Sequence, residues 1–299
     1  MTRDEVRALG RGLAKLHARF ASCFGRREAQ GHALTYLKGL LLGEGRKNVE
    51  RMALRFGAAA DGSAASQKEV VAMQEFLTRS PWDAQGVMRE IQAAFAEEFV
   101  PSTSQWPLGT VGVLDETSIV KAGRESCGTR PQYCGRLAKT ANCQVGVFLL
   151  GVTPAGAALL DCRLYLPKEW AKDRRRRKQT RVPSSIRFRT KSQIALDLVE
   201  RTLAAGQVRF DWLAADAFYG HDGDFLSALD KLGQRRGGQH ARVAQEVHGR
   251  TAALGVGPQA DARPNEGRGQ DGRGAGEKAA ARSVEDRQRP PRRRGTGGV

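Results

Sequence analysis

The sequence has no feature that would place the protein in a membrane or in an oxidising compartment. Its longest apolar run, residues 145–152, is far too short to cross a bilayer, and residues 1–5 do not begin a signal-peptide pattern. The 299 residues include five cysteines, and an odd number without a secretory signal predicts reduced thiols instead of a disulfide framework. We therefore expect a cytoplasmic protein with no membrane partner.

Several common catalytic and metal motifs are also missing. No Ser-His-Asp, Cys-His or phosphate-loop pattern occurs, and His221 beside Gly220 is more typical of a helix start than of a catalytic base. Cys127, Cys134 and Cys143 suggest a zinc site, but no C-x-x-C pair or nearby histidine completes it. We interpret these three cysteines as buried thiols.

Acidic residues are too few to balance the basic ones. Lys and Arg exceed Asp and Glu by 17, and the pI is about 10.3. Such an excess favours a polyanionic partner, and in the cytoplasm nucleic acid is the first candidate. The alternative is a basic tail that contacts no specific partner.

Basic residues are dense between Pro167 and Lys191, where acids are almost absent. A block of like charges is usually a solvated and mobile face. Predicted structure on both sides ties this block to a folded domain, so contact with phosphates is an equally good interpretation. The block contains Trp170, Arg174, Arg175, Arg176, Arg177, Lys178, Arg181, Arg187, Arg189 and Lys191.

From the start of the chain to about residue 100, apolar residues recur at helical spacing. The pattern predicts about five helices, and we assign residues 1–104 to a helical N-terminal domain. We expect each apolar stripe to be buried, because an amphipathic helix packs its apolar face against a core. The first stripe consists of Val6, Leu9, Leu13, Leu16 and Phe20.

After Trp106 the period changes from helical to strand-like, which predicts an α/β unit with a mixed sheet over residues 105–235. A clear turn at residues 153–156 indicates that the second and third strands form an antiparallel hairpin. A basic, glycine-rich loop is expected from Lys121 to Lys139. The expected elements are strands 111–114, 142–150, 157–166 and 210–215, with helices after Ser192 and around 225–232.

Two of the predicted strands end on a carboxylate. Val111 to Leu114 leads to Asp115, and Phe210 to Ala215 leads to Asp216. Aspartates fixed at strand ends in a basic protein suggest a site for Mg²⁺, which prefers a few carboxylates together with waters and phosphate. The alternative is that both are ordinary strand-end residues that cap loops or pair with arginines. Glu116 should point to the other face of the sheet, so it is a poor second ligand.

The composition changes abruptly near residue 235. From Gly237 to Val299 there is no Phe, Trp, Tyr, Ile or Met, and the single leucine is Leu254. Such a segment cannot bury enough apolar surface to offset its ordering entropy, so we expect residues 236–299 to be disordered. A natural basic tail and a reading-frame shift in a GC-rich gene both explain this composition. We favour the frame shift, because an α/β domain would need another strand at this point.

Short blocks of sequence occur in a specific order along the chain. In the helical part they are Gly45-Arg46-Lys47-Asn48-Val49-Glu50-Arg51-Met52-Ala53 and Ser80-Pro81-Trp82-Asp83. Later blocks are Leu114-Asp115-Glu116-Thr117, Gln132-Tyr133-Cys134-Gly135, Asn142-Cys143-Gln144, Leu164-Tyr165-Leu166-Pro167 with Trp170, Thr190-Lys191 and Asp216-Ala217-Phe218-Tyr219-Gly220. Together they resemble the DDE transposases of bacterial insertion sequences, specifically the insertion sequence 701 type near the insertion sequence 4 group. The resemblance covers approximately residues 30 to 235.

The resemblance implies a ribonuclease-H-like catalytic domain behind a helical domain that binds DNA ends. It implies that Asp115 and Asp216 are metal-binding catalytic residues for Mg²⁺ or Mn²⁺. The implied partner is double-stranded DNA, both the transposon terminal inverted repeats and the target, in a homodimer associated with the nucleoid. On location we expect contacts to the transposon end from Lys121, Arg130, Lys139, Arg174, Arg175, Arg176, Arg177, Lys178 and Lys191.

The sequence departs from the family pattern where a third catalytic acid is expected. The family carries a Glu on a later helix, and nothing after Arg235 resembles that part. The tail residues Glu246, Glu266, Glu277 and Glu285 are therefore not assigned to this role. We expect a defective transposase whose incomplete sheet has an unpaired edge. The alternatives are a non-catalytic protein that recognises transposon ends and an unrelated basic metal nuclease.

Overall fold

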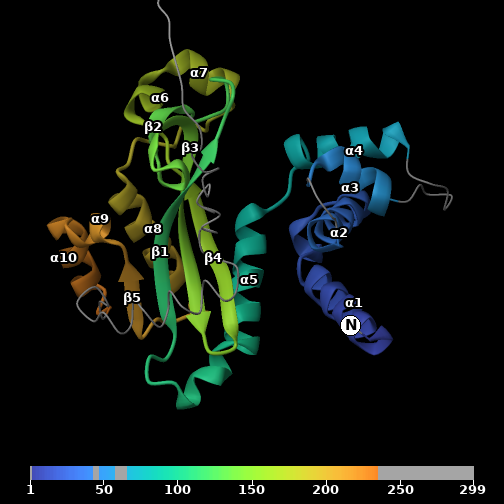
Figure 1. Cartoon of the computed structure of the whole chain (residues 1–299), viewed down its shortest axis with the longest axis horizontal. Coiled ribbons are helices and arrows are strands. Elements are labelled where there is room, and N and C mark those ends of the chain that lie inside the picture. Colours follow the sequence, from blue (N-terminus) through green and yellow to red (C-terminus); the bar gives the residue numbers. More distant parts are fainter. Residues whose placement is uncertain (1, 43–46, 58–65, 235–299) are drawn as a thin grey trace, which may run out of the picture. The chain divides into compact units, whose positions relative to one another are not determined.

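The computed structural model describes residues 2–42, 47–57 and 66–234 (Figure 1). The tail at 236–299 and its four glutamates therefore lie outside the described residues, as do the predictions made for them. No helix in the described ranges combines the length and the apolar character that a membrane span requires.

The N-terminal part is helical, as predicted. Four of its helices begin at a side chain that caps them: Thr2 and Glu5 form a capping box at the first helix, Ser66 and Glu69 form another at the fourth, and Asn48 and Asp83 cap the third and the fifth. The helices are α1 (Arg3–Arg19), α2 (Arg27–Leu42), α3 (Val49–Phe56), α4 (Gln67–Thr78) and α5 (Ala84–Glu98), with 3-10 segments at Ala21–Cys23 and Val100–Gln105.

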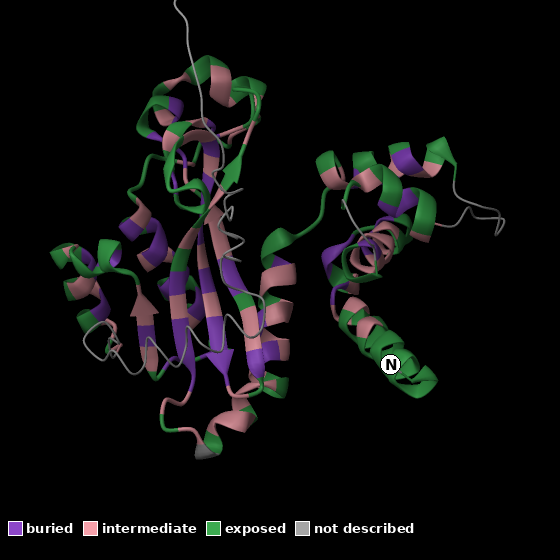
Figure 2. Ribbon diagram, viewed as in Figure 1, coloured by how far each residue is buried: buried purple, intermediate pink, exposed green. Residues whose placement is uncertain are grey.

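The apolar stripe of α1 is not buried, which corrects the expectation for this helix. Val6 is 51% exposed and Leu9 is 62% exposed, and no residue of α1 is buried (Figure 2). Of the residues in the predicted stripe, only Phe20, just after the helix, is part of the core of the helical region, together with Val70, Met73 and Phe76. Periodicity shows that a helix has an apolar side, but it does not show that a packing partner exists.

The second half of the described chain forms one open mixed sheet, which confirms the predicted α/β class (Figure 1). The order is β2-β3-β1-β5, with β4 paired to β3; the β1–β5 pair is parallel and the other pairs are antiparallel. The strands are β1 (Val111–Val120), β2 (Arg130–Cys134), β3 (Lys139–Thr153), β4 (Gly156–Leu164) and β5 (Trp212–Ala215). β2 lies inside the segment that we expected to be a loop.

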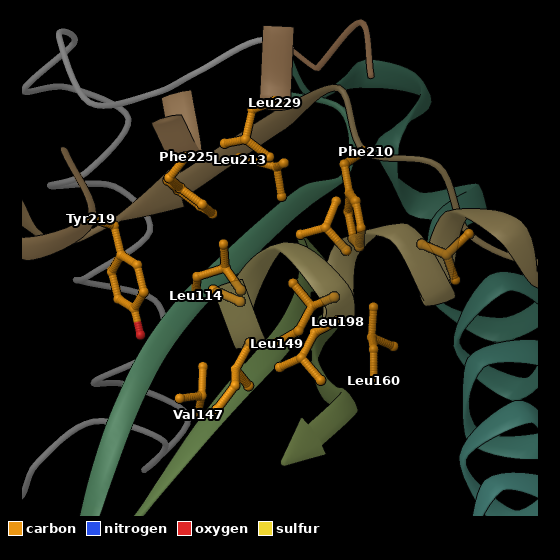
Figure 3. Close-up of a cluster of buried hydrophobic side chains, with 14 of the residues drawn as sticks. Leu114, Val147, Leu149, Leu160, Leu198, Phe210, Leu213, Tyr219, Phe225 and Leu229 are labelled. Atoms are coloured by element: carbon orange, nitrogen blue, oxygen red, sulfur yellow. The ribbon is translucent and has the colours of Figure 1, made fainter. Parts of the chain in front are cut away.

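One face of the sheet packs against α8 (Lys191–Ala204), α9 (Ala217–Gly220) and α10 (Gly223–Lys231). Leu114 of β1 and Leu149 of β3 meet Leu198 of α8 in this core, and each is at most 1% exposed (Figure 3). Thr190 and Gln193 form a capping box that fixes where α8 begins. This core holds the ends of β1 and β5 in place.

The basic block after β4 is folded. It forms two short helices, α6 (Lys168–Lys172) and α7 (Arg174–Gln179), and Trp170 of α6 is 1% exposed. The Trp170 indole Nε1 donates a hydrogen bond of 2.8 Å to the Thr129 carbonyl beside β2. The block is thus anchored to the sheet by a buried aromatic side chain.

Candidate active site

The parallel pairing of β1 with β5 brings the two predicted aspartates together. In the register of this pair, Leu114 lies opposite Ala215; Asp115 follows Leu114 within β1, and Asp216 follows Ala215 just after β5. At the other end, the Asp211 carboxylate accepts a 2.7 Å hydrogen bond from the Thr110 amide, which fixes the start of β5 against the start of β1. Two segments about a hundred residues apart in sequence therefore present their carboxylates near one another. The predicted strand end at Asp115 was wrong, because pairing with β3 continues β1 through Asp115 to Val120; only Asp216 follows the end of its strand.

Each aspartate is oriented by backbone amides through one oxygen. Asp115 Oδ1 accepts a 2.7 Å hydrogen bond from the Glu116 amide. Asp216 caps α9, and its Oδ1 accepts bonds of 3.0 and 3.4 Å from the amides of Phe218 and Tyr219. In the described part of the chain, Oδ2 of each aspartate has no hydrogen-bond or ion-pair partner. Two oriented carboxylates thus leave an oxygen available to an external ligand.

The electrostatic environment of this pair is unfavourable for negative charge. Partial desolvation, together with the nearby charges of Asp216 and Glu116, raises the pKa of Asp115 above its ordinary value, although the Glu116 amide acts in the opposite direction. No Lys or Arg in the described ranges forms an ion pair with either aspartate. The charge balance of the pair is therefore suited to a cation.

Glu116 points to the other face of the sheet, as predicted. Its Oε1 lies 2.5 Å from Nζ of Lys191 at the start of α8, and its buried Oε2 has no hydrogen-bond partner among the described residues. Lys191 Nζ also lies 5.4 Å from the centre of the ring of Phe218, two residues after Asp216. Lys191, which we expected to contact DNA, is thus engaged inside the protein next to the acidic pair.

Tyr219 is a residue of the site that the sequence did not identify. It is 0% exposed, and its hydroxyl has no hydrogen-bond partner within the described ranges. Burial and the neighbouring charges of Glu116, Asp216 and Asp115 raise its pKa above the ordinary tyrosine value. Figure 3 shows Tyr219 at the margin of the apolar cluster that contains Leu114. Its position within the block that begins at Asp216 was the available signal.

A cavity of about 480 Å³ lies next to Asp216. It opens beside the edge of β5, and its walls are mainly apolar side chains from β5 and α10. Its lining includes Leu213, Ala215, Asp216, Tyr219, Phe225, Leu226 and Leu229. The acidic pair is thus bordered by a mostly apolar hollow on the side of β5.

The remaining basic residues that we expected to contact DNA divide into two groups. Arg130 lies 2.5 Å from Glu169, and Arg176 and Arg177 have partners within the α6–α7 segment. In the described part of the chain, the side chains of the other five have no ion-pair or hydrogen-bond partner. These five are Lys121, Lys139, Arg174, Arg175 and Lys178.

The described residues contain no group of three or more His, Cys, Asp or Glu side chains placed to hold a metal ion. Cys134 and Cys143 are buried, and Cys127 is half-buried. Burial raises the pKa of the Cys127 and Cys143 thiols, so neither favours the thiolate form that binds zinc. The acidic pair therefore remains the candidate centre.

Two comparisons with known proteins identify relatives of the chain. A family model described as a DDE superfamily endonuclease matches residues 19–294. A "Probable transposase for insertion sequence element IS701" from Microchaete diplosiphon is 30% identical over 161 residues, which are 54% of this chain and 38% of that protein. The aligned part therefore spans well under half the length of the relative. The family match continues past Arg235, where we expected the resemblance to end.

Proposed function

The chain belongs to the DDE superfamily of endonucleases, and we propose from this membership that it is a DNA transposase of an insertion sequence. Its reaction would be metal-dependent cleavage of a DNA strand followed by strand transfer. The observation that supports this most directly is the β1–β5 register, which places Asp115 beside Asp216. Members of the family generally use divalent metal ions, and we propose Mg²⁺ or Mn²⁺ here.

The two aspartates fit a divalent cation. Both are oriented by backbone amides. Among the residues that the structure describes, both keep an oxygen without a partner, and no basic side chain forms an ion pair with them. A bound divalent ion would activate water and polarise a phosphodiester at this position. In the proposed roles, β1 holds Asp115 rigidly, and Asp216 is held by its capping bonds to α9. Tyr219 and Leu114 are themselves buried and line the mostly apolar hollow next to Asp216.

We propose that the catalytic centre is incomplete in the described chain. The support for this proposal is that no cluster of three candidate ligands occurs in the described ranges. The protein would then bind DNA but cleave it poorly. The five basic side chains without a described partner, Lys121, Lys139, Arg174, Arg175 and Lys178, would contact the terminal repeats and the target DNA. Residues 1–104 would bind the transposon end, and residues 105–235 would form the catalytic domain. We also propose that the chain acts as a homodimer on DNA in the bacterial cytoplasm, where it is associated with the nucleoid.

Cleavage can be tested with the full-length chain and duplexes that carry the terminal repeats. The wild-type chain, D115N and D216N would be incubated with Mg²⁺ or Mn²⁺, and nicked products would be separated on a denaturing gel. We expect DNA binding with little cleavage in all three. Robust cleavage that disappears in D115N and D216N would support the metal site but contradict the proposal that the catalytic centre is incomplete.

A second candidate function is a non-catalytic protein that occupies transposon ends. The absence of a three-ligand cluster from the described residues, combined with the charge of +17, favours it. Binding without cleavage that weakens steeply as salt rises, and that is unchanged by D115N and by EDTA, would favour this function. Binding to terminal repeats that requires the metal and both aspartates would count against it.

A further inference from the structure

The structure separates the side chains of the basic run in α7 into two sets. Successive residues of a helix are rotated by about 100°, so Arg174, Arg175 and Lys178 share one side of α7. Arg176 and Arg177 lie on the opposite side. The three residues of the first set are exposed, and the two residues of the second are half-buried.

The second set, Arg176 and Arg177, points inward and holds α7 in place; the first set, Arg174, Arg175 and Lys178, points outward. Arg177 donates hydrogen bonds to three carbonyls, those of Ala171 at 3.0 Å, Pro183 at 2.8 Å and Ile186 at 2.8 Å. Its guanidinium therefore ties α6 and the segment after α7 to one another. The Arg176 guanidinium lies 4.8 Å from the centre of the buried Trp170 ring. These contacts give the short helix a defined position on the domain.

Both acids of the basic segment are engaged in internal contacts. From Pro167 to Lys191 the sequence has eleven Lys and Arg residues and two acids, Glu169 and Asp173. Glu169 pairs with Arg130 at 2.5 Å. Asp173 caps α7 and lies 3.8 Å from Arg176. Neither acid therefore neutralises the outward set.

We propose that the outward face of α7, formed by Arg174, Arg175 and Lys178, is a preformed contact for the phosphate backbone of double-stranded DNA. The identification of DNA as the partner rests on the proposed function. The division into an anchoring and a contacting set rests on the contacts that Arg176 and Arg177 make within the protein. Three exposed cations on an anchored helix are complementary in charge to a polyanion. They lose less conformational freedom on binding than cations on an unstructured tail would. The anchoring pair, Arg176 and Arg177, makes no contact with DNA in this arrangement.

Salt-dependent binding tests the proposal. The full-length wild type and R174Q/K178Q would be titrated with a fluorescent duplex at several salt concentrations. R209Q/K231Q is the matched control, because it removes two exposed positive charges outside the basic segment. Circular dichroism and thermal melting verify that all three fold alike.

We expect R174Q/K178Q to bind on the order of tenfold more weakly near 0.15 M salt, with a salt slope smaller by about two. The control should keep both the affinity and the slope of the wild type. An unchanged slope in R174Q/K178Q, with wild-type binding intact, would overturn the contact alone. Equal weakening in the control would also overturn it, because only net charge would then matter. A wild-type chain that binds no duplex would overturn the proposed DNA function together with this contact.

Discussion

At the residue scale, the site combines two carboxylates with a buried phenol that has no hydrogen-bond partner among the described residues. Asp115 lies partway along β1 and Asp216 directly follows β5; both are exposed, whereas Tyr219 is completely buried. Lys191 pairs with Glu116, and in the described ranges no cation forms an ion pair with either aspartate. This arrangement favours an external metal ion at the expense of the stability of the metal-free chain.

The raised pKa of Asp115 predicts the effect of removing its charge. A carboxyl whose pKa is higher in the folded than in the unfolded state destabilises the fold at pH values above that folded pKa. D115N should therefore raise the melting temperature at pH 7. The gain should disappear below about pH 4, where the carboxyl is protonated in both states. Melting curves across pH measure this, and a stability that falls in D115N at pH 7 would contradict it.

The buried hydroxyl of Tyr219 predicts an unusually mild effect of its removal. Because no described residue forms a hydrogen bond with the hydroxyl, Y219F should leave the free energy of unfolding unchanged or raise it by about 1 kcal/mol. Urea unfolding measures the difference. A destabilisation above about 1 kcal/mol would show that the hydroxyl has a partner, such as a bound water shared with Glu116.

At the element scale, the core between α8 and the sheet supports the site. Leu198 of α8 is completely buried, so L198A should lower the free energy of unfolding by about 2 to 5 kcal/mol. L9A is the control, because Leu9 of α1 is 62% exposed and its truncation should change stability by no more than about 0.5 kcal/mol. Similar losses in the two variants would show that α1 packs against a partner.

The anchoring role of Arg177 predicts a local effect. R177K keeps the charge but cannot donate to the carbonyls of Ala171, Pro183 and Ile186 together. We expect faster amide exchange in residues 167–186, with global stability nearly unchanged. R175K, which changes an exposed residue with no described partner, is the control. Equal exchange in both variants would remove Arg177 from its anchoring role.

Sequence patterns predicted the elements that carry the site but missed others. The apolar runs before Asp115 and Asp216 indicated strands, because a strand buried on both faces is continuously hydrophobic. β2 was missed because Pro131 and alternating exposed residues lie in a short strand that depends on pairing with β3. Its pairing partner is a property of the tertiary structure, so no local pattern indicates it. The adjacency of Asp115 and Asp216 was expected, but the burial of Tyr219 required the packing of α9 on the sheet.

At the scale of the whole molecule, the basic side chains differ in how they are used. Some, such as Arg177, form hydrogen bonds or ion pairs within the protein, and others, such as Arg174, are exposed to solvent. Lys191 belongs to the first kind because Glu116 holds it beside the site. Net charge alone therefore overstates how many cations are available to DNA.

The most direct test of the account is whether the full-length chain binds a divalent ion through both aspartates. Mn²⁺ would be titrated calorimetrically into the wild type, D115N and D216N at neutral pH, with D224N as a control for an exposed aspartate outside the pair. We predict binding by the wild type and D224N, and an affinity at least about tenfold lower in both D115N and D216N. Equal Mn²⁺ affinity in all four proteins would contradict a metal site built on Asp115 and Asp216.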